Sequence, residues 1–301
     1  MSVVYLVISF SLFCTVWSLW PASVSAAERT STVIKEIPYP GATKGDRRRS
    51  LDVYLPAKSE RRPPMMIFVH GGFWVLSDDD YRIGTAIAET LSREGVAVAL
   101  LRYRLAPEVS YRSQLEDVAF GVALVLREAQ RYGYDNSRIF ISGHSAGGHL
   151  AAMVALDANY LVKHQASPQS LAGVVTFSGL YDLSPKHSIS EHQRLAIEKT
   201  FGRDPAVLKQ ASPVSHVRAG APPFLILTAQ SDFAGFLADA KRFSDELSRA
   251  GNPRVERWIV PERDHFTLMK LADGDNQARL LLLGFLKLAP RPPEFRNSRR
   301  S

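Results

Sequence analysis

The chain has 301 residues, of which 46% are hydrophobic and 22% charged, the composition of an ordinary globular protein. This length suffices for one large enzyme-sized domain, and the sequence contains no internal repeat. The net charge of +7 does not indicate a nucleic-acid partner, because the basic residues gather in segments 44–49 and 60–62 and after Lys287, without interleaved aromatic residues. We therefore expect solvated basic loops and no nucleic-acid binding.

The first 26 residues carry no charged side chain, and residues 3–20 are almost wholly apolar. Val24-Ser25-Ala26 matches the small-residue cleavage site of a secretory signal peptide, so we expect cleavage after Ala26 and a secreted or periplasmic protein. The apolar run is also long enough to span a bilayer, which leaves an uncleaved membrane anchor as the lesser alternative. Cys14 is the only cysteine and lies in this segment, so the mature chain would contain no disulfide.

Short apolar runs alternate with longer amphipathic stretches along the rest of the chain. The strand candidates are residues 33–37, 51–55, 65–70, 96–101, 139–142, 173–178, 224–229 and 255–260. The helix candidates are residues 81–94, 113–132, 146–158, 234–250 and 275–288. Strands that alternate with helices of this length predict an α/β fold, in which a mostly parallel eight-stranded sheet is covered on both faces.

One segment interrupts this alternation. Residues 181–221 form a long, mixed stretch rich in His and Pro, which we interpret as a helical insertion or partial lid above the site. The predicted organisation is therefore a signal peptide over residues 1–26, one domain over 27–288 that contains the insertion, and a disordered basic tail over 289–301.

Three consecutive aspartates, Asp78-Asp79-Asp80, stand just before the first helix candidate and would suit a divalent cation. Further oxygen ligands at loop spacing are missing, so we interpret them as a helix N-terminus, where carboxylates satisfy exposed N–H groups and the helix dipole. We expect no metal site here.

The most informative motif is Gly143-His144-Ser145-Ala146-Gly147, which follows the strand candidate 139–142 and opens the helix candidate 146–158. In this setting the glycines of a G-x-S-x-G pattern let the backbone pack closely around a strained turn that lifts the serine hydroxyl clear of the sheet. Ser145 is therefore a candidate nucleophile. Such a hydroxyl needs a base, an acid that orients the base, and donors for the oxyanion.

Candidates for the base and the acid follow two later strands. Asp232 comes just past the seventh strand candidate, and His265 lies in the loop after the eighth. Ligands of parallel sheets bind beyond the carboxyl ends of the strands, which is where both residues and Ser145 fall. Asp264 and Glu262 are rival acids, but they lie too near His265 along the loop to approach its far ring nitrogen.

A pair of glycines marks the candidate oxyanion donors. The third strand candidate runs into His70-Gly71-Gly72-Phe73-Trp74, whose free backbone N–H groups would point into a cleft. Trp74 itself is either a core aromatic residue or part of the substrate pocket, and the sequence leaves both alternatives open.

The order serine, acid, histidine, with each residue after a strand, resembles the α/β-hydrolase superfamily over residues 33–288. The His-Gly-Gly-Phe-Trp stretch, residues 102–108, Gly-His-Ser-Ala-Gly-Gly and Asp-His-Phe are similar to its carboxylesterase and arylformamidase branch. This resemblance implies that Ser145 is the nucleophile, His265 the general base and then acid, and Asp232 the orienting carboxylate. Two departures are Phe73, in place of the third glycine of the lipase-type run, and residues 229–231, in place of a glycine-containing turn.

The same resemblance implies which groups surround the substrate. The oxyanion hole would consist of the backbone N–H groups of Gly72, Phe73 and Ala146. The residues that we expect along the substrate are Gly71, Trp74 and His144.

The implied reaction is hydrolysis of a small-molecule carboxylic ester through an acyl-enzyme, without a metal, nucleotide or flavin cofactor. An arylformamidase that cleaves N-formylkynurenine is the alternative, but the apparent export signal favours a carboxylesterase acting on small or aromatic esters. A non-catalytic binding protein of the same fold is the alternative from another class. Such proteins typically lack a triad member, whereas this chain has all three.

Overall fold

The computed structural model describes residues 31–43, 45–57, 61–76, 78–184, 190–274 and 276–286. The expected signal peptide with its cleavage site after Ala26 and the expected tail 289–301 lie outside these residues, so both stay predictions. Within the described ranges, no helix combines the length and apolar character that crossing a membrane requires.

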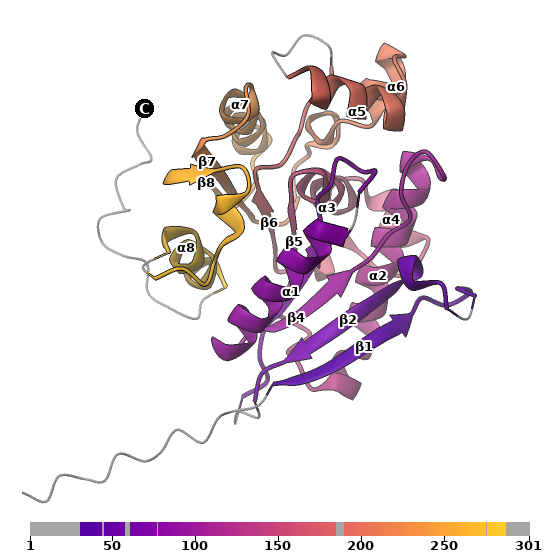
Figure 1. Cartoon of the computed structure of the whole chain (residues 1–301), viewed down its shortest axis with the longest axis vertical. Helices are drawn as coiled ribbons and strands as arrows, with labels where there is room; N and C mark the ends of the chain where they lie inside the picture. Colours follow the sequence, from indigo (N-terminus) through magenta and orange to yellow (C-terminus); the bar gives the residue numbers. More distant parts are fainter. Residues whose placement is uncertain are drawn as a thin grey trace, which may run out of the picture.

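Eight strands form one sheet in the order β1-β2-β4-β3-β5-β6-β7-β8, which confirms the predicted α/β fold (Figure 1). β2 pairs antiparallel with both β1 and β4, and all neighbours from β4 to β8 are parallel. The strands are β1 (Thr32–Pro38), β2 (Ser50–Leu55), β3 (Met65–Val69), β4 (Ala97–Leu101), β5 (Ile139–His144), β6 (Gly173–Phe177), β7 (Phe224–Ser231) and β8 (Val255–Asp264).

Five of the described helices lie close to the ranges that the sequence predicts, two lie in the insertion, and one short helix was not predicted. They are α1 (Asp78–Arg93), α2 (Tyr111–Tyr132), α3 (Ala146–Leu156), α4 (Ala158–Val162), α5 (Glu191–Phe201), α6 (Pro205–Gln210), α7 (Phe236–Arg249) and α8 (Gln277–Phe285). The predicted helix 146–158 ends at Leu156 as α3. The unpredicted helix α4 follows Asp157, whose side chain accepts a hydrogen bond from the N–H of Asn159 and caps it. The aspartate run opens α1, as expected for a helix N-terminus.

The described part of the insertion is helical. α5 and α6 both lie within residues 181–221, and Figure 1 shows them at one end of the molecule, away from β1 and β2. The sequence expectation of a helical insertion therefore agrees with these elements.

Two apolar cores lie on opposite faces of the sheet. In β3, Met65, Ile67 and Val69 belong to the core that includes residues of α2, α3 and α7, whereas Met66 and Phe68 belong to the core that includes residues of α1 and α8. Successive side chains of a strand point to opposite faces, so a strand that is covered on both sides reads as one continuous apolar run. This is why periodicity in the sequence located the central strands well.

The last two strands extend further than the sequence predicts. β7 reaches Ser231 and β8 reaches Asp264, beyond the expected ends at residues 229 and 260. Their ladder shifts register after Ala229 and resumes with Ser231 opposite Asp264. The extensions are largely exposed and polar, so hydrophobic patterning does not reveal them.

Two glycines allow the turn after β5 to pack tightly. A Cβ atom on Gly147 would lie 2.1 Å from the carbonyl oxygen of Val69, and one on Gly143 would lie 2.3 Å from the carbonyl oxygen of Gly147. Both contacts are with backbone, which cannot move aside as a flexible side chain can. The glycines thus bring the start of α3 directly against β3 and β5.

We expect Gly147→Ala to destabilise the protein by on the order of 3 kcal/mol or more, because the new methyl group must displace the backbone of β3. The measurement is the free energy of unfolding from a urea titration. Gly274→Ala is the matched control, since a Cβ atom there meets nothing within 4 Å. Equal stability of the two variants would contradict the close packing described above.

Candidate active site

Ser145 lies in the tight turn between β5 and α3, with φ 53° and ψ −118°. A positive φ is strained for a residue with a side chain, so the surrounding structure must hold it. The N–H of Ser145 donates to the carbonyl of Phe177 on β6 at 2.9 Å, and its own carbonyl accepts from the N–H of His149 at 3.0 Å. These contacts give the strand, turn and helix arrangement that the sequence predicts for a nucleophile.

The paired ends of β7 and β8 bring Asp232 and His265 together. Because Ser231 lies opposite Asp264, the next residues of the two strands are neighbours. The Nδ1 atom of His265 is 2.7 Å from Oδ1 of Asp232, and the side chains are only 4% and 0% exposed. A buried carboxylate at Nδ1 orients the imidazole and leaves Nε2 to exchange protons with a substrate.

Asp264, the rival acid, is engaged within its own loop. Its Oδ1 atom accepts hydrogen bonds from the N–H of Phe266 at 3.0 Å and from the N–H and hydroxyl of Thr267, each at 2.8 Å. The bonds from Thr267 and Phe266 lower the pKa of Asp264, so its carboxylate stays ionised. Asp264 thus shapes the loop that carries His265, whereas Asp232 contacts the ring.

Sequence reasoning missed Ser178, which binds the other oxygen of Asp232. The Ser178 hydroxyl donates to Oδ2 of Asp232, and the N–H of Phe233 donates to Oδ1 at 2.8 Å. Ser178 follows β6 directly and has a φ of 47°, another strained position at the carboxyl edge of the sheet. The signal for this residue was its place at the end of the predicted strand 173–178, which becomes the neighbour of β7 in the sheet.

His144 is buried beside His265. Its ring lies 4.7 Å from that of His265, and its Nε2 lies 2.8 Å from the carbonyl oxygen of His265, while the expected substrate contact stays a prediction. Burial and the neighbouring His265 lower the pKa of His144 to about 3, so the neutral ring donates Nε2–H to that carbonyl. His144 therefore supports the backbone of His265 because the last residue of β5 points toward the β8 loop.

The loop after β3 presents backbone donors. Gly72, Phe73 and Trp74 have φ values of 94°, 53° and 62°, three consecutive left-handed residues. Among the described residues, no acceptor is found for the N–H groups of Gly72 and Phe73. Ala146, the first residue of α3, likewise has an N–H at a helix N-terminus, where no intrahelical acceptor exists. Such free donors suit an oxyanion.

Tyr103 holds the start of this loop. Its hydroxyl lies 3.1 Å from the carbonyl oxygens of both His70 and Gly71, and its ring stacks on that of His70 at 4.3 Å. With its carbonyl engaged in this way, Gly71 contributes to the shape of the loop, and a substrate contact for it stays a prediction.

Trp74 ends the loop and is buried, which favours the core alternative. Its carbonyl accepts from the N–H of Ala106 at 3.0 Å and from the side-chain amide of Gln114 at 2.8 Å. Its indole N–H donates to Nδ1 of His149 at 3.2 Å, and its ring packs edge-on against Phe201 of α5 at 5.0 Å. Trp74 thus ties the loop to the core and to the insertion.

The described hydrogen bonds include none between Ser145 and His265. Both residues are almost fully buried, at 5% and 3% exposure, and the ring of His144, the residue before Ser145, contacts that of His265. Contacts between nucleophile and base are often long in unliganded hydrolases and tighten when substrate binds. The catalytic roles of Ser145, Asp232 and His265 are therefore proposals, and they are argued below.

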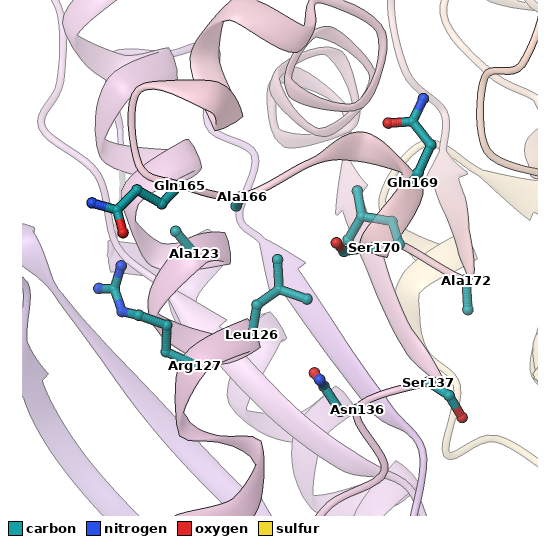
Figure 2. A pocket seen from close by; sticks show the side chains of 11 residues that line it. Ala123, Leu126, Arg127, Asn136, Ser137, Gln165, Ala166, Gln169, Ser170 and Ala172 are labelled. Atoms are coloured by element: carbon teal, nitrogen blue, oxygen red, sulfur yellow. The ribbon is translucent and has the colours of Figure 1, made fainter.

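Two further observations concern residues other than Ser145, Asp232 and His265. Within the described ranges, no group of three or more His, Cys, Asp or Glu residues is placed to hold a metal ion. A surface hollow of about 500 Å³ lies at the opposite, amino-terminal end of the strands, between Arg127 of α2, Asn136 before β5 and Ala172 before β6 (Figure 2). None of the predicted site residues lines this hollow.

The fold is that of an α/β hydrolase, with Ser145 in the tight turn between β5 and α3. The family model BD-FAE matches residues 51–247, which is more than half of the chain. The chain belongs to the BD-FAE family, and the expected resemblance to the carboxylesterase and arylformamidase branch is confirmed.

Relatives carry both of the names that the sequence suggested. Esterase LipC of Mycobacterium tuberculosis (strain ATCC 25618 / H37Rv) is 29% identical over 73% of this chain, which spans 57% of LipC. The kynurenine formamidase of Danio rerio is 30% identical over 86% of this chain and 84% of its own length. These names support the predicted class, a carboxylic ester hydrolase, with a formamidase as the weaker alternative.

Solved structures agree on the fold. A truncated form of a carbohydrate esterase from gut microbiota superimposes with a TM-score of 0.72 at 21% identity, over 87% of this chain and 98% of that one. At this identity the likeness concerns the fold alone.

We expect Ser178→Ala to lower kcat by about 10-fold with little change in KM, because a hydrogen bond to a buried carboxylate contributes roughly 1.5–3 kcal/mol. Steady-state kinetics on an ester substrate provide the measurement. Ser170→Ala is the control, since Ser170 is an exposed serine in the hollow at the far end of the sheet. An unchanged kcat for Ser178→Ala would show that the hydrogen bond from Ser178 to Asp232 does not contribute to the reaction rate.

The buried ring of His149 predicts a pH dependence of stability. Burial lowers the pKa of His149 from 6.5 to about 4, so the unfolded chain binds a proton more readily and stability falls as the pH drops below 6.5. His149→Gln should flatten the stability profile between pH 6 and 4.5 by about 1.4 kcal/mol per pH unit relative to the wild type. Urea titrations at each pH test this, with the exposed His192→Gln as control.

Proposed function

We propose that the chain is a serine carboxylesterase that cleaves small or aromatic carboxylic esters through an acyl-enzyme. The observation that carries this proposal is the bond from Nδ1 of His265 to Asp232, formed at the same sheet edge as the strained turn of Ser145. The esterase names of several relatives support the same reaction.

Acylation begins when Oγ of Ser145 attacks the ester carbonyl carbon and Nε2 of His265 accepts the hydroxyl proton. The carbonyl oxygen becomes an oxyanion, which accepts hydrogen bonds from the backbone N–H groups of Gly72, Phe73 and Ala146. The imidazolium, stabilised by Asp232, then gives its proton to the ester oxygen as the C–O bond breaks. The alcohol leaves and the acyl group stays on Ser145.

Deacylation repeats these steps with water. His265 accepts a proton from the water as its oxygen attacks the acyl carbon, and the oxyanion returns to the same three donors. When the bond to Oγ of Ser145 breaks, the ring returns the proton to that oxygen and the carboxylic acid leaves. The charged groups needed are Asp232 and the transient imidazolium, so the chemistry requires no cofactor.

Formamide hydrolysis is the second candidate, because the Danio rerio relative named kynurenine formamidase aligns with most of this chain. A triad of this kind cleaves either bond, and the leaving group distinguishes them. Comparing kcat/KM for p-nitrophenyl acetate, methyl ferulate and N-formylkynurenine separates the two. A preference for the formamide over both esters would overturn the carboxylesterase proposal.

We also propose that the protein is exported, on the apolar segment 3–20 and the Val24-Ser25-Ala26 site. The mass of the mature protein purified from a host with a secretory pathway tests this. Cleavage after Ala26 supports export, whereas an intact N-terminus in the membrane fraction supports the anchor.

Ser145→Ala should reduce ester turnover by at least ~10⁴-fold, since loss of the nucleophile removes most of the catalysis. The variant should keep the wild-type circular dichroism spectrum, because a hydroxyl at a buried turn contributes little to the core. Covalent labelling by an organophosphonate, followed by mass spectrometry, should mark the peptide of Ser145 in the wild type only. Substantial hydrolysis by a folded variant would assign the nucleophile to another residue.

A further inference from the structure

Phenylalanine rings surround the imidazole of His265 on several sides. Phe233, the residue after Asp232, lies 4.4 Å from the imidazole between ring centroids, Phe236 at the start of α7 lies 5.1 Å away, and Phe266 lies 5.4 Å away. Phe233 and Phe266 also contact each other edge to face at 5.9 Å. We call Phe233, Phe236 and Phe266 the aromatic collar.

The members of the aromatic collar differ in exposure. Phe236 is 3% exposed and belongs to the core, whereas Phe233 is half-buried and Phe266 is 54% exposed. Phe266 is one of few large apolar residues with so much surface in water, although its backbone is fixed by the bond of its N–H to Asp264. An exposed aromatic side chain on a backbone that is already hydrogen-bonded is available for an apolar ligand.

The reaction itself says which part of a substrate reaches this surface. Asp232 occupies Nδ1 of His265, so Nε2 must protonate the departing alcohol oxygen. That transfer requires the oxygen to come within about 2.6–3.2 Å of the ring nitrogen. The carbon substituent on this oxygen therefore begins within a few bond lengths of the imidazole. It must contact the residues that surround the imidazole. The acyl substituent, by contrast, stays attached to the carbonyl carbon at Ser145.

We propose that Phe233 and Phe266 form the subsite for the alcohol side of the ester and select apolar aryl or alkyl alcohols over sugar hydroxyls. The inference rests on the proposed ester hydrolysis and names its leaving-group class. An aryl or alkyl group buries the exposed faces of both rings, and an aromatic substituent can add an edge-to-face contact. A sugar hydroxyl would bring polar groups against these two rings, whose side chains offer no hydrogen-bond partner.

The test keeps the acyl group constant and varies the alcohol. The substrates are ethyl, hexyl and benzyl acetate and an acetylated methyl glycoside, and the measured quantity is kcat/KM. In the wild type, hexyl and benzyl acetate should exceed ethyl acetate and the glycoside by about 10-fold or more. A wild type that prefers the acetylated glycoside would overturn the subsite.

Variants of Phe266 then test whether this residue causes the preference for apolar alcohols. Phe266→Ala should reduce the benzyl-to-ethyl ratio of kcat/KM by about 10-fold, and Phe266→Leu should restore the hexyl-to-ethyl ratio but not the benzyl-to-ethyl ratio. Ile259→Ala is the matched control, because Ile259 is a 45% exposed apolar residue on the strand that leads to His265. A series of ethyl esters with longer acyl chains should show the same relative rates in the wild type and Phe266→Ala.

The outcomes are separable. A uniform loss for all alcohols in Phe266→Ala would show that the ring merely supports His265, and a change confined to the acyl series would place Phe266 on the acyl side. Either result overturns the subsite while leaving ester hydrolysis intact. If the wild type hydrolyses none of the acetates, the proposed function itself fails.

Discussion

The register of β7 against β8 is the constraint on which the site depends. After the shift at Ala229, Ser231 lies opposite Asp264, and this pair alone determines that Asp232 and His265 are neighbours. The two strands beside them complete the arrangement in sheet order, since His144 at the end of β5 binds the backbone of His265 and Ser178 after β6 binds Asp232. Four adjacent parallel strands thus each contribute a polar group at the same edge, where open α/β sheets bind their ligands.

Burial strengthens these hydrogen bonds and keeps the neighbouring imidazole rings neutral. His144 and His149 flank the elbow, and burial lowers the pKa of each far below the usual value for histidine, to about 3 and about 4. A neutral imidazole has one donor and one acceptor, so the Nε2–H that each gives to a carbonyl fixes its tautomer. Of the three rings of His144, His149 and His265, only that of His265 has a carboxylate hydrogen-bonded at Nδ1, which suits the proton-transfer role proposed for it.

Much of this could be predicted from the sequence, for identifiable reasons. Central strands covered on both faces are unbroken apolar runs, and the elbow needs glycines at 143 and 147 because backbone lies where a Cβ atom would be. Ser178 could not be predicted in the same way, because its partner depends on β6 lying beside β7, which hydrophobic patterning does not state. The same holds for the bond between His144 and the carbonyl of His265, which depends on the loop after β8 lying against the end of β5.

The insertion is joined to the oxyanion loop through the core. His149 accepts the indole N–H of Trp74 and donates Nε2–H to the carbonyl of Ala211 at the end of α6, at 2.7 Å. Phe201 of α5 packs against both the Trp74 and the His149 rings. Displacement of α5 or α6 would therefore disturb Trp74. The N–H of the preceding residue, Phe73, is one of the proposed oxyanion donors, and its direction depends on the position of Trp74. The contacts of α5 and α6 with Trp74 and His149 therefore help to hold the loop after β3, while Phe266 in the loop after β8 stays exposed.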